Sequence, residues 1–159
     1  MMADQDTVQI VQRLYAAFQQ GDFPAFLDTL ADNVEWFVPG PRPTLPWAGL
    51  RQGRAQVAQF FAEFATTAET ERFEPQEFIA QGEKVIVLGQ RRDRVKATGR
   101  VCESEWVQVY VVRADKIVSF RGYYDTAAMV AAFRGEWAGS RAGFLSPSQQ
   151  QDSPLISDD

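Results

Sequence analysis

Hydrophobic residues in the first half of the chain recur every three or four positions, the spacing of one face of an α-helix. Three segments follow this pattern, at residues 8–20, 23–31 and 54–68. Thr7 and Asp22 precede the first two segments and are the predicted N-caps, because their side-chain oxygens can accept hydrogen bonds from the first helical turn. Gly21 is predicted to end the first helix. The first two segments therefore predict a helical hairpin.

The pattern then changes to an alternation of apolar and polar positions rich in β-branched and aromatic residues, which predicts strands. Strands are expected at residues 34–39, 71–80, 84–96, 101–112 and 117–124, followed by a short helix up to residue 133. Residues 39–53 are rich in proline and glycine, so no regular structure is expected there. Trp47 and two leucines in that segment predict a packed loop, either over the mouth of a cavity or simply held by the tryptophan.

The order helix, helix, strand, helix, four strands, helix (α-α-β-α-β-β-β-β-α) predicts an α+β fold. We expect a curved, mostly antiparallel, cone-shaped sheet that wraps around the N-terminal helices and encloses an internal pocket. A two-residue last turn would pair Arg113 with Lys116 and place Val107 opposite Gly122, unless a β-bulge reverses the parity. Residues 1–133 are predicted to form one domain, and residues 134–159 a flexible tail rich in Ser, Gln, Pro and Asp.

The amino-acid composition limits the kinds of ligand and of catalytic site that we expect in this protein. The net charge of −5 argues against nucleic-acid binding, and no apolar run is long enough to predict a membrane span. The chain has no histidine and one cysteine, Cys102. No imidazole base, disulfide or zinc site is therefore expected, and we predict no metal, no cofactor and a cytoplasmic location. Twenty aromatic residues, by contrast, are enough for a core and a lined cavity.

Short motifs spread along residues 8–133 resemble the SnoaL-like, ketosteroid-isomerase-like branch of the nuclear transport factor 2-like superfamily. They are Tyr15-Ala-Ala-Phe18, Gly21-Asp22, Leu30-Ala-Asp32-Asn-Val34-Glu-Trp36, Gly53-Arg54, Phe60-Phe61, Asp115-Lys116-Ile117 and Tyr124-Asp125. This superfamily includes ketosteroid isomerases, polyketide cyclases, limonene epoxide hydrolases, and binding or dimerisation modules. The resemblance implies the fold and leaves the function open.

The catalytic sets of these enzymes are incomplete here. Where ketosteroid isomerases carry a tyrosine and an aspartate base, this chain has Leu14 and Val38; Tyr15, one position on, is expected to point about 100° away around the helix. Where SnoaL-like cyclases carry an acid/base and a histidine, it has Gly122 and Gln108.

The Arg-x-Asp motif of the epoxide hydrolases is present as Arg91-Arg92-Asp93, but the second aspartate of that family falls on Gly122. Arg91 and Asp93 share a strand face, where they form either a pocket pair that orients water or stabilises an oxyanion, or a solvated charge cluster. Glu105 lies in an apolar strand and faces either the cavity or the outer surface. These three residues are the catalytic candidates.

The candidate pocket wall consists of Leu14, Phe18, Trp36, Val38, Phe60, Phe64, Val107 and Tyr124. One hypothesis is a protein that binds a hydrophobic small molecule and catalyses metal-free acid/base chemistry, as an isomerase, cyclase or epoxide-hydrolase-like enzyme. The alternative is a ligand-binding or dimerisation module without catalysis. A homodimer is expected in either case, because the convex face of an open sheet needs cover.

Overall fold

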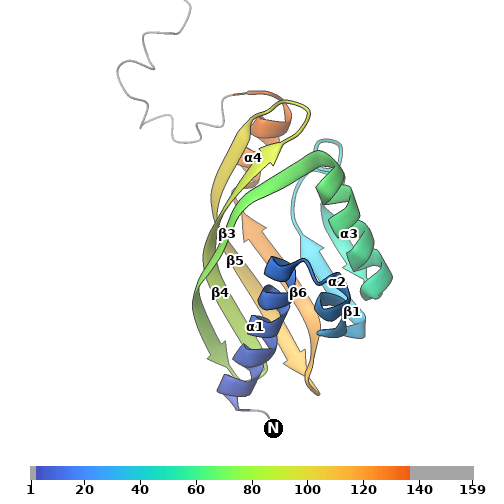
Figure 1. Cartoon of the computed structure of the whole chain (residues 1–159), viewed down its shortest axis with the longest axis vertical. Coiled ribbons are helices and arrows are strands. Elements are labelled where there is room, and N and C mark those ends of the chain that lie inside the picture. The colour runs from blue at the N-terminus through green and yellow to red at the C-terminus, as the bar shows by residue number, and fades with distance from the viewer. Residues whose placement is uncertain (1–2, 137–159) are drawn as a thin grey trace, which may run out of the picture.

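The computed structural model describes residues 3–136, in which a single six-stranded sheet curls around two N-terminal helices (Figure 1). The strand order is β2-β1-β6-β5-β4-β3. All neighbouring strands are antiparallel except β1 and β6, which run parallel. The predicted α+β class and the mostly antiparallel curved sheet are confirmed. The predicted tail lies outside the described residues, apart from residues 134–136.

Helix α1 (Asp4–Gln20) begins four residues earlier than predicted. Thr7 is not its N-cap: Ala3 takes that place, and the Thr7 hydroxyl donates to the carbonyl of Asp4 at 2.8 Å. Gly21 ends the helix in the left-handed conformation, as expected. Asp22 caps α2 (Phe23–Asp28) by accepting a hydrogen bond from the Ala25 backbone at 3.1 Å.

Strand β1 (Leu30–Val38) starts where the second helix was expected to continue. A short strand, β2 (Gly49–Gln52), lies in the proline-rich segment that was predicted to be irregular. It pairs with the end of β1, because the chain reverses direction between Val38 and Gly49 and brings the two backbones into register. Trp47 in that segment is buried, so the predicted packed loop is confirmed.

Helix α3 (Gly53–Thr67) leads directly into the long strands β3 (Ala68–Gln81), β4 (Lys84–Val95), β5 (Val101–Arg113) and β6 (Lys116–Tyr124). A last helix, α4 (Thr126–Phe133), is capped by Asp125, which accepts a hydrogen bond from the Ala128 backbone at 3.0 Å.

The register of β5 on β6 differs from the expected one. Arg113 pairs with Lys116 as predicted, but the register shifts between Val111 and Val112. Beyond that shift Gly122 lies opposite Gln108 and not opposite Val107. One extra residue on β6 is a β-bulge, and a bulge reverses which partners share a face.

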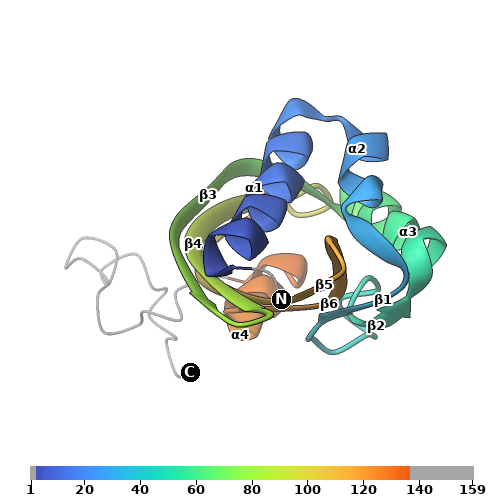
Figure 2. The same cartoon turned by 90° about the horizontal axis from the view of Figure 1, so that it is seen from below.

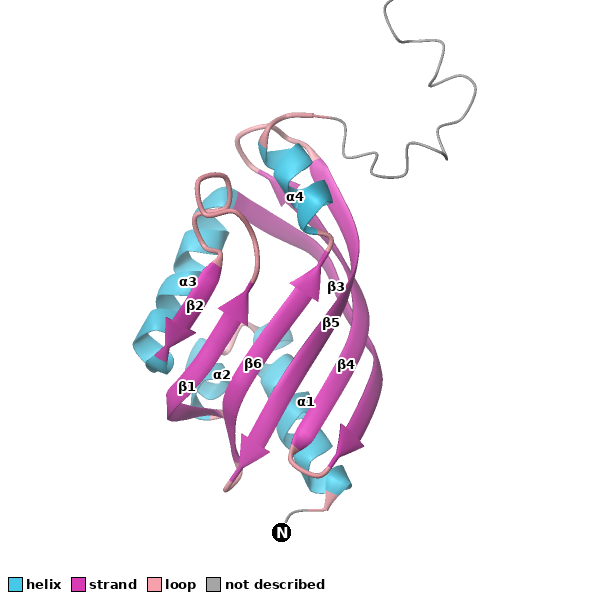
Figure 3. Cartoon of the chain, turned by 180° about the vertical axis from the view of Figure 1, so that it is seen from behind, coloured by secondary structure: helices cyan, strands magenta, loops and turns pink. Residues whose placement is uncertain are grey.

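All helices except α4 lie on the concave side of the sheet or at its β1–β2 end, so the sheet forms a half-open cone (Figure 2). Seen from behind, α4 lies at the upper end of the strands, and the rest of the convex side carries no helix (Figure 3). The concave side holds the buried apolar residues of alternate strand positions, such as Val85, Val87, Tyr110 and Phe120. This two-sided alternation is what positions the site described next.

Candidate ligand cavity

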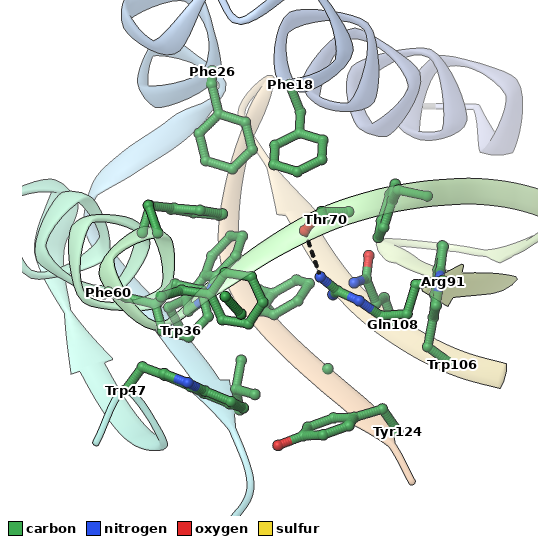
Figure 4. A pocket seen from close by; sticks show the side chains of 18 of the residues that line it. Phe18, Phe26, Trp36, Trp47, Phe60, Thr70, Arg91, Trp106, Gln108 and Tyr124 are labelled. Atoms are coloured by element: carbon green, nitrogen blue, oxygen red, sulfur yellow. Dashed lines mark hydrogen bonds between the residues drawn. The ribbon is translucent and has the colours of Figure 1, made fainter. Parts of the chain in front are cut away.

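A cavity of about 680 Å³ lies between the concave face of the sheet and the helices (Figure 4). Every long strand contributes to its wall, as do α1, α2, α3 and α4. The volume falls in the range of about 300–1,000 Å³ that is typical of small-molecule sites. The curvature of β3–β6 creates this space, because the strands bend away from α3 while α1 and α2 cover one end of the cone.

Aromatic side chains make most of the cavity wall. They are Tyr15, Phe18, Phe23, Phe26, Trp36, Trp47, Phe60, Phe61, Phe64, Phe73, Trp106, Tyr110, Phe120 and Tyr124. Trp36 stacks on Phe120 with ring centroids 3.7 Å apart, and Trp106 stacks on Phe73 at 4.8 Å. The indole N–H groups of Trp36, Trp47 and Trp106 have no hydrogen-bond partner in residues 3–136, but neighbouring atoms cover them, so they do not act as donors to the cavity.

Arg91 and Asp93 form a paired charge at one side of the cavity. Arg91 Nε donates to Asp93 Oδ2 at 2.6 Å, and Nη2 donates to Oδ1 at 2.9 Å. The Thr70 hydroxyl donates to Oδ1 at 2.8 Å and accepts from Nη2 at 3.3 Å (Figure 4). Arg91 and Thr70 line the cavity, whereas Asp93 is fully buried behind them. Both carboxylate oxygens are therefore occupied in holding the arginine.

The guanidinium of Arg91 also lies against two aromatic rings. Its central carbon is 5.4 Å from the centroid of Phe64 and 5.3 Å from that of Phe73. Such cation–π contacts, together with the two hydrogen bonds to Asp93, hold the side chain in one orientation. Nη1 has no hydrogen-bond partner within residues 3–136 and remains reachable from the cavity. The cavity thus contains a fixed cation with a free donor.

A second polar group joins α1 to β5. The Tyr15 hydroxyl donates to Gln108 Oε1 at 2.7 Å, and the Tyr110 hydroxyl lies 3.0 Å from the same oxygen and 3.1 Å from the Tyr15 hydroxyl. Burial raises the pKa of both tyrosines far above the ordinary value near 10, so both phenols stay neutral donors. All three side chains line the cavity.

Most of the predicted wall residues line this cavity: Leu14, Phe18, Trp36, Val38, Phe60, Phe64 and Tyr124. Val107 does not, because alternate residues of β5 face opposite sides and Val107 lies on the convex side, 36% exposed. Glu105 shares that outer side. Of the three predicted catalytic residues, the structure brings together Arg91 and Asp93 and places Glu105 on the other side of the sheet.

Tyr15, Thr70, Phe73 and Tyr110 were not among the predicted site residues. Tyr15 reaches the cavity alongside Leu14 because the sheet wraps around α1 and contacts more than one face of that helix: the Tyr15 ring lies 5.9 Å from Phe73 and 6.0 Å from Tyr110. The alternation of β5 carried a usable signal, since Trp106, Gln108 and Tyr110 are spaced by two and share one face.

Within residues 3–136 no three His, Cys, Asp or Glu side chains lie close enough together to hold a metal ion. Cys102 is buried beside Asp93, and burial together with that carboxylate raises the thiol pKa to about 12. No helix in this part of the chain is long and apolar enough to cross a membrane.

Comparison with known proteins identifies the fold and the family. A nuclear transport factor 2-like protein of Burkholderia xenovorans is 38% identical, with the match covering 86% of this chain and all of that one, at a TM-score of 0.74. The crystal structure of TerC with polyporic acid is 25% identical and covers 81% of this chain and 98% of that one, also at 0.74. An uncharacterised protein of Mycobacterium tuberculosis is 26% identical over 137 residues, which are 86% of this chain and all of the relative.

The sequence profile of the SnoaL-like domain matches residues 11–120, which include the cavity from α1 to Phe120 on β6. The motifs that suggested this resemblance occur in the elements that form the fold. The chain therefore belongs to the SnoaL-like domain family, with the nuclear transport factor 2-like, ketosteroid-isomerase-like fold.

Proposed function

We propose that this protein binds one apolar, largely aromatic small molecule in the cavity, with an acidic oxygen of that molecule next to Arg91. The observation that carries the proposal is an aromatic-walled cavity of about 680 Å³ that contains a fixed cation. Flat aromatic ligands gain from such walls both by burial of apolar area, at about 25 cal/mol per Å², and by ring contacts with the stacked side chains.

Arg91 suits an anionic oxygen better than a neutral one. Asp93 and Thr70 occupy Nε and Nη2, which leaves Nη1 as the donor that a ligand oxygen can meet. A charge-assisted hydrogen bond in a water-poor cavity is stronger than one between neutral groups. TerC, which is similar to this chain, was co-crystallised with polyporic acid, and an acidic ligand in that relative is in keeping with the proposal.

Two probes that share a ring system test this proposal: naphthalene and 2-naphthoate, measured by isothermal titration calorimetry. Wild-type protein should bind both. Arg91→Met keeps much of the length of the side chain and removes its charge and donors, so it should weaken 2-naphthoate binding at least tenfold, by about 1.4 kcal/mol, and leave naphthalene binding nearly unchanged. Failure of wild-type protein to bind naphthalene would contradict the cavity proposal. Equal loss of both probes would contradict the role of Arg91.

A second candidate function is metal-free acid/base catalysis of the isomerase, cyclase or epoxide-hydrolase type, which the Arg91–Asp93 pair favours. Arg91 would stabilise an oxyanion that develops in the reaction, and Asp93 would position it. Glu105, on the outer side of the sheet, takes no part in this version. Turnover of polyketide-like, steroid-like or epoxide substrates that drops in Asp93→Asn would support catalysis, and turnover indifferent to Asp93→Asn would remove the assignment.

We also propose that a second copy of the chain covers the convex face of the sheet. Leu88, Val107 and Tyr123 are adjacent on β4, β5 and β6 and form an apolar row on that face. Glu105 lies on one side of the row and Arg121 on the other, about 13 Å apart along the strand direction. A two-fold axis through the row would therefore place each arginine beside the glutamate of the other copy.

A further inference from the structure

Besides the Arg91 guanidinium, the cavity wall contains the buried carboxamide of Gln108. Its side chain is nine-tenths buried, with 8% exposed, and its oxygen accepts from Tyr15 at 2.7 Å and from Tyr110 at 3.0 Å. Gln108 Nε2 has no hydrogen-bond partner within residues 3–136. That nitrogen remains reachable from the cavity, in contrast to the covered indole nitrogens. The amide thus presents two unused N–H donors to the cavity.

The two phenols determine which end of the amide faces the cavity. With Oε1 toward the hydroxyls, both phenolic hydrogens find an acceptor. If the amide were turned over, Tyr110 could still donate to Tyr15 at 3.1 Å, but the Tyr15 hydrogen would have no acceptor among the described residues. A buried donor without an acceptor is costly, and ionisation of the phenols does not relieve the cost, because burial keeps both neutral. Tyr15 and Tyr110 therefore act as positioning residues for Gln108.

We infer that Gln108 recognises a neutral carbonyl-type oxygen of the bound molecule, which makes the ligand class an aromatic ketone, quinone or similar carbonyl compound. This inference rests on the proposed function, because it needs a ligand in the same cavity. The scarcity of acceptors in the described cavity wall also supports it: the carboxylate among the lining residues is Glu69, which is exposed, while Asp93 is buried behind Arg91 and Thr70. A ligand rich in acceptors and poor in donors therefore fits better than one rich in hydroxyl donors.

A matched pair of probes tests this recognition. 1-Tetralone and tetralin share one bicyclic skeleton and differ by a carbonyl oxygen, and calorimetry gives the dissociation constant of each. The quantity to compare is the ratio of the two constants, tetralin over 1-tetralone, in wild type and variants, since the ratio cancels effects that both probes share. Gln108→Met removes the donor at nearly constant length and should lower this ratio at least fivefold, with tetralin binding nearly unchanged.

Further variants separate recognition from folding. The double variant Tyr15→Phe, Tyr110→Phe removes both phenolic donors and frees the amide to turn. It should lower the ratio two- to threefold, which a purely structural loss would not do because it would weaken both probes alike. Gln90→Leu, on the convex face of β4, is the control of the same residue type and should leave the ratio unchanged. If Gln108→Met does not fold, the triple variant Tyr15→Phe, Tyr110→Phe, Gln108→Met leaves no phenol unpaired and takes its place.

The outcomes are distinguishable. A ratio that is the same in wild type and in the Gln108→Met or triple variant overturns the inference, while tetralin binding still supports the cavity proposal. Absence of tetralin binding in wild-type protein overturns the cavity proposal and this inference with it. A ratio that falls in Gln108→Met and in the double variant Tyr15→Phe, Tyr110→Phe but not in Gln90→Leu is the expected result.

Discussion

Asp93 holds Arg91 by two hydrogen bonds, from Nε to Oδ2 at 2.6 Å and from Nη2 to Oδ1 at 2.9 Å, and the carboxylate itself is fully buried. The arginine side chain is 19% exposed and faces the cavity. The two residues are two positions apart and therefore lie next to each other on the same face of β4, so the strand backbone sets their geometry. Asp93 therefore acts on the cavity through Arg91 and Thr70, which it holds in place.

Removing the Asp93 carboxylate should damage both stability and anion binding. In Asp93→Ala the arginine is left partly buried without its counter-ion, and loss of one partner of a buried pair costs about 3–5 kcal/mol. We expect a decrease of that size in the free energy of unfolding, measured by urea denaturation, and weaker binding of 2-naphthoate. Glu103→Ala, which breaks the exposed pair with Arg92 on the other face, should change little. Equal effects of the two substitutions would contradict the special role of Asp93.

Filling the cavity should weaken ligand binding without loss of stability. Val38 is buried on β1 and faces the cavity, so Val38→Phe places a ring in existing space. We expect naphthalene binding to weaken at least tenfold and the melting temperature to stay the same or rise, because a filled void gains dispersion contacts. Phe37→Leu, next to it on the outer face, should leave binding intact. A melting temperature lowered by more than a few degrees in Val38→Phe would show that the cavity lacks the space described.

The buried phenols predict a loss of stability in alkaline solution. Burial raises the pKa of Tyr15 and Tyr110 in the folded state, while the unfolded chain ionises near the ordinary value of about 10. Below that pH neither state loses the protons, so these groups add no pH dependence. Above it the unfolded state loses them and the folded state does not, and the free energy of unfolding falls by about 1.4 kcal/mol per pH unit for each tyrosine.

Tyr15→Phe should therefore reduce this alkaline slope by the contribution of one tyrosine. The measurement is a series of urea denaturation curves between pH 9 and 11, with phenolate absorbance followed in parallel and the urea-unfolded chain as the reference for the ordinary pKa. The same slope in wild type and Tyr15→Phe would mean that the Tyr15 phenol ionises freely in the folded protein, contrary to its burial.

The proposed dimer makes a prediction about the convex face. Val107 lies at the centre of the apolar row and Tyr123 at its β6 end, and they are 36% and 42% exposed. Replacing Val107 with arginine should convert a dimer into a monomer in sedimentation velocity, because two like charges would face each other across the two-fold axis. Gln76→Arg, on the exposed strand β3, should not change the sedimentation coefficient. A wild-type protein that sediments as a monomer at high concentration would refute the proposal.

Local pattern was enough to predict the classes of element and several details of the site. Gly21 ends α1 through its left-handed backbone, and Asp22 caps α2 with its carboxylate. Both effects depend on a few neighbouring residues, and both residues behave as predicted. The pairing of Arg91 with Asp93 also follows from local pattern, since residues two apart on a strand share a face. Only the folded sheet shows that this face is the inner one. In the sequence, a charged stretch at the end of a strand is equally typical of a solvated surface.

Three features depended on tertiary contacts. Strand β2 forms because a proline-rich loop returns to β1. The hydrophobic periodicity of the sequence does not predict this pairing. The bulge on β6, opposite Val111 and Val112, is a single-residue register shift that reverses the alternation of β6 beyond it, so that Ile117 and Phe120 are both buried. Glu105 and Val107 lie outside and Gln108 inside because burial of Trp106 and Tyr110 on the concave side decides which of two equivalent faces of β5 points inward.

The sequence by itself determined the α+β element order, the lack of imidazole chemistry and the family likeness. All three depend on composition and on contacts between residues that are near in the chain. Only the tertiary structure decided that Tyr15, Gln108 and Tyr110 form one hydrogen-bonded group, because residues 15 and 108 are separated by 93 positions. The curvature of the sheet around α1 brings them together, and that curvature is a property of all the strands acting jointly.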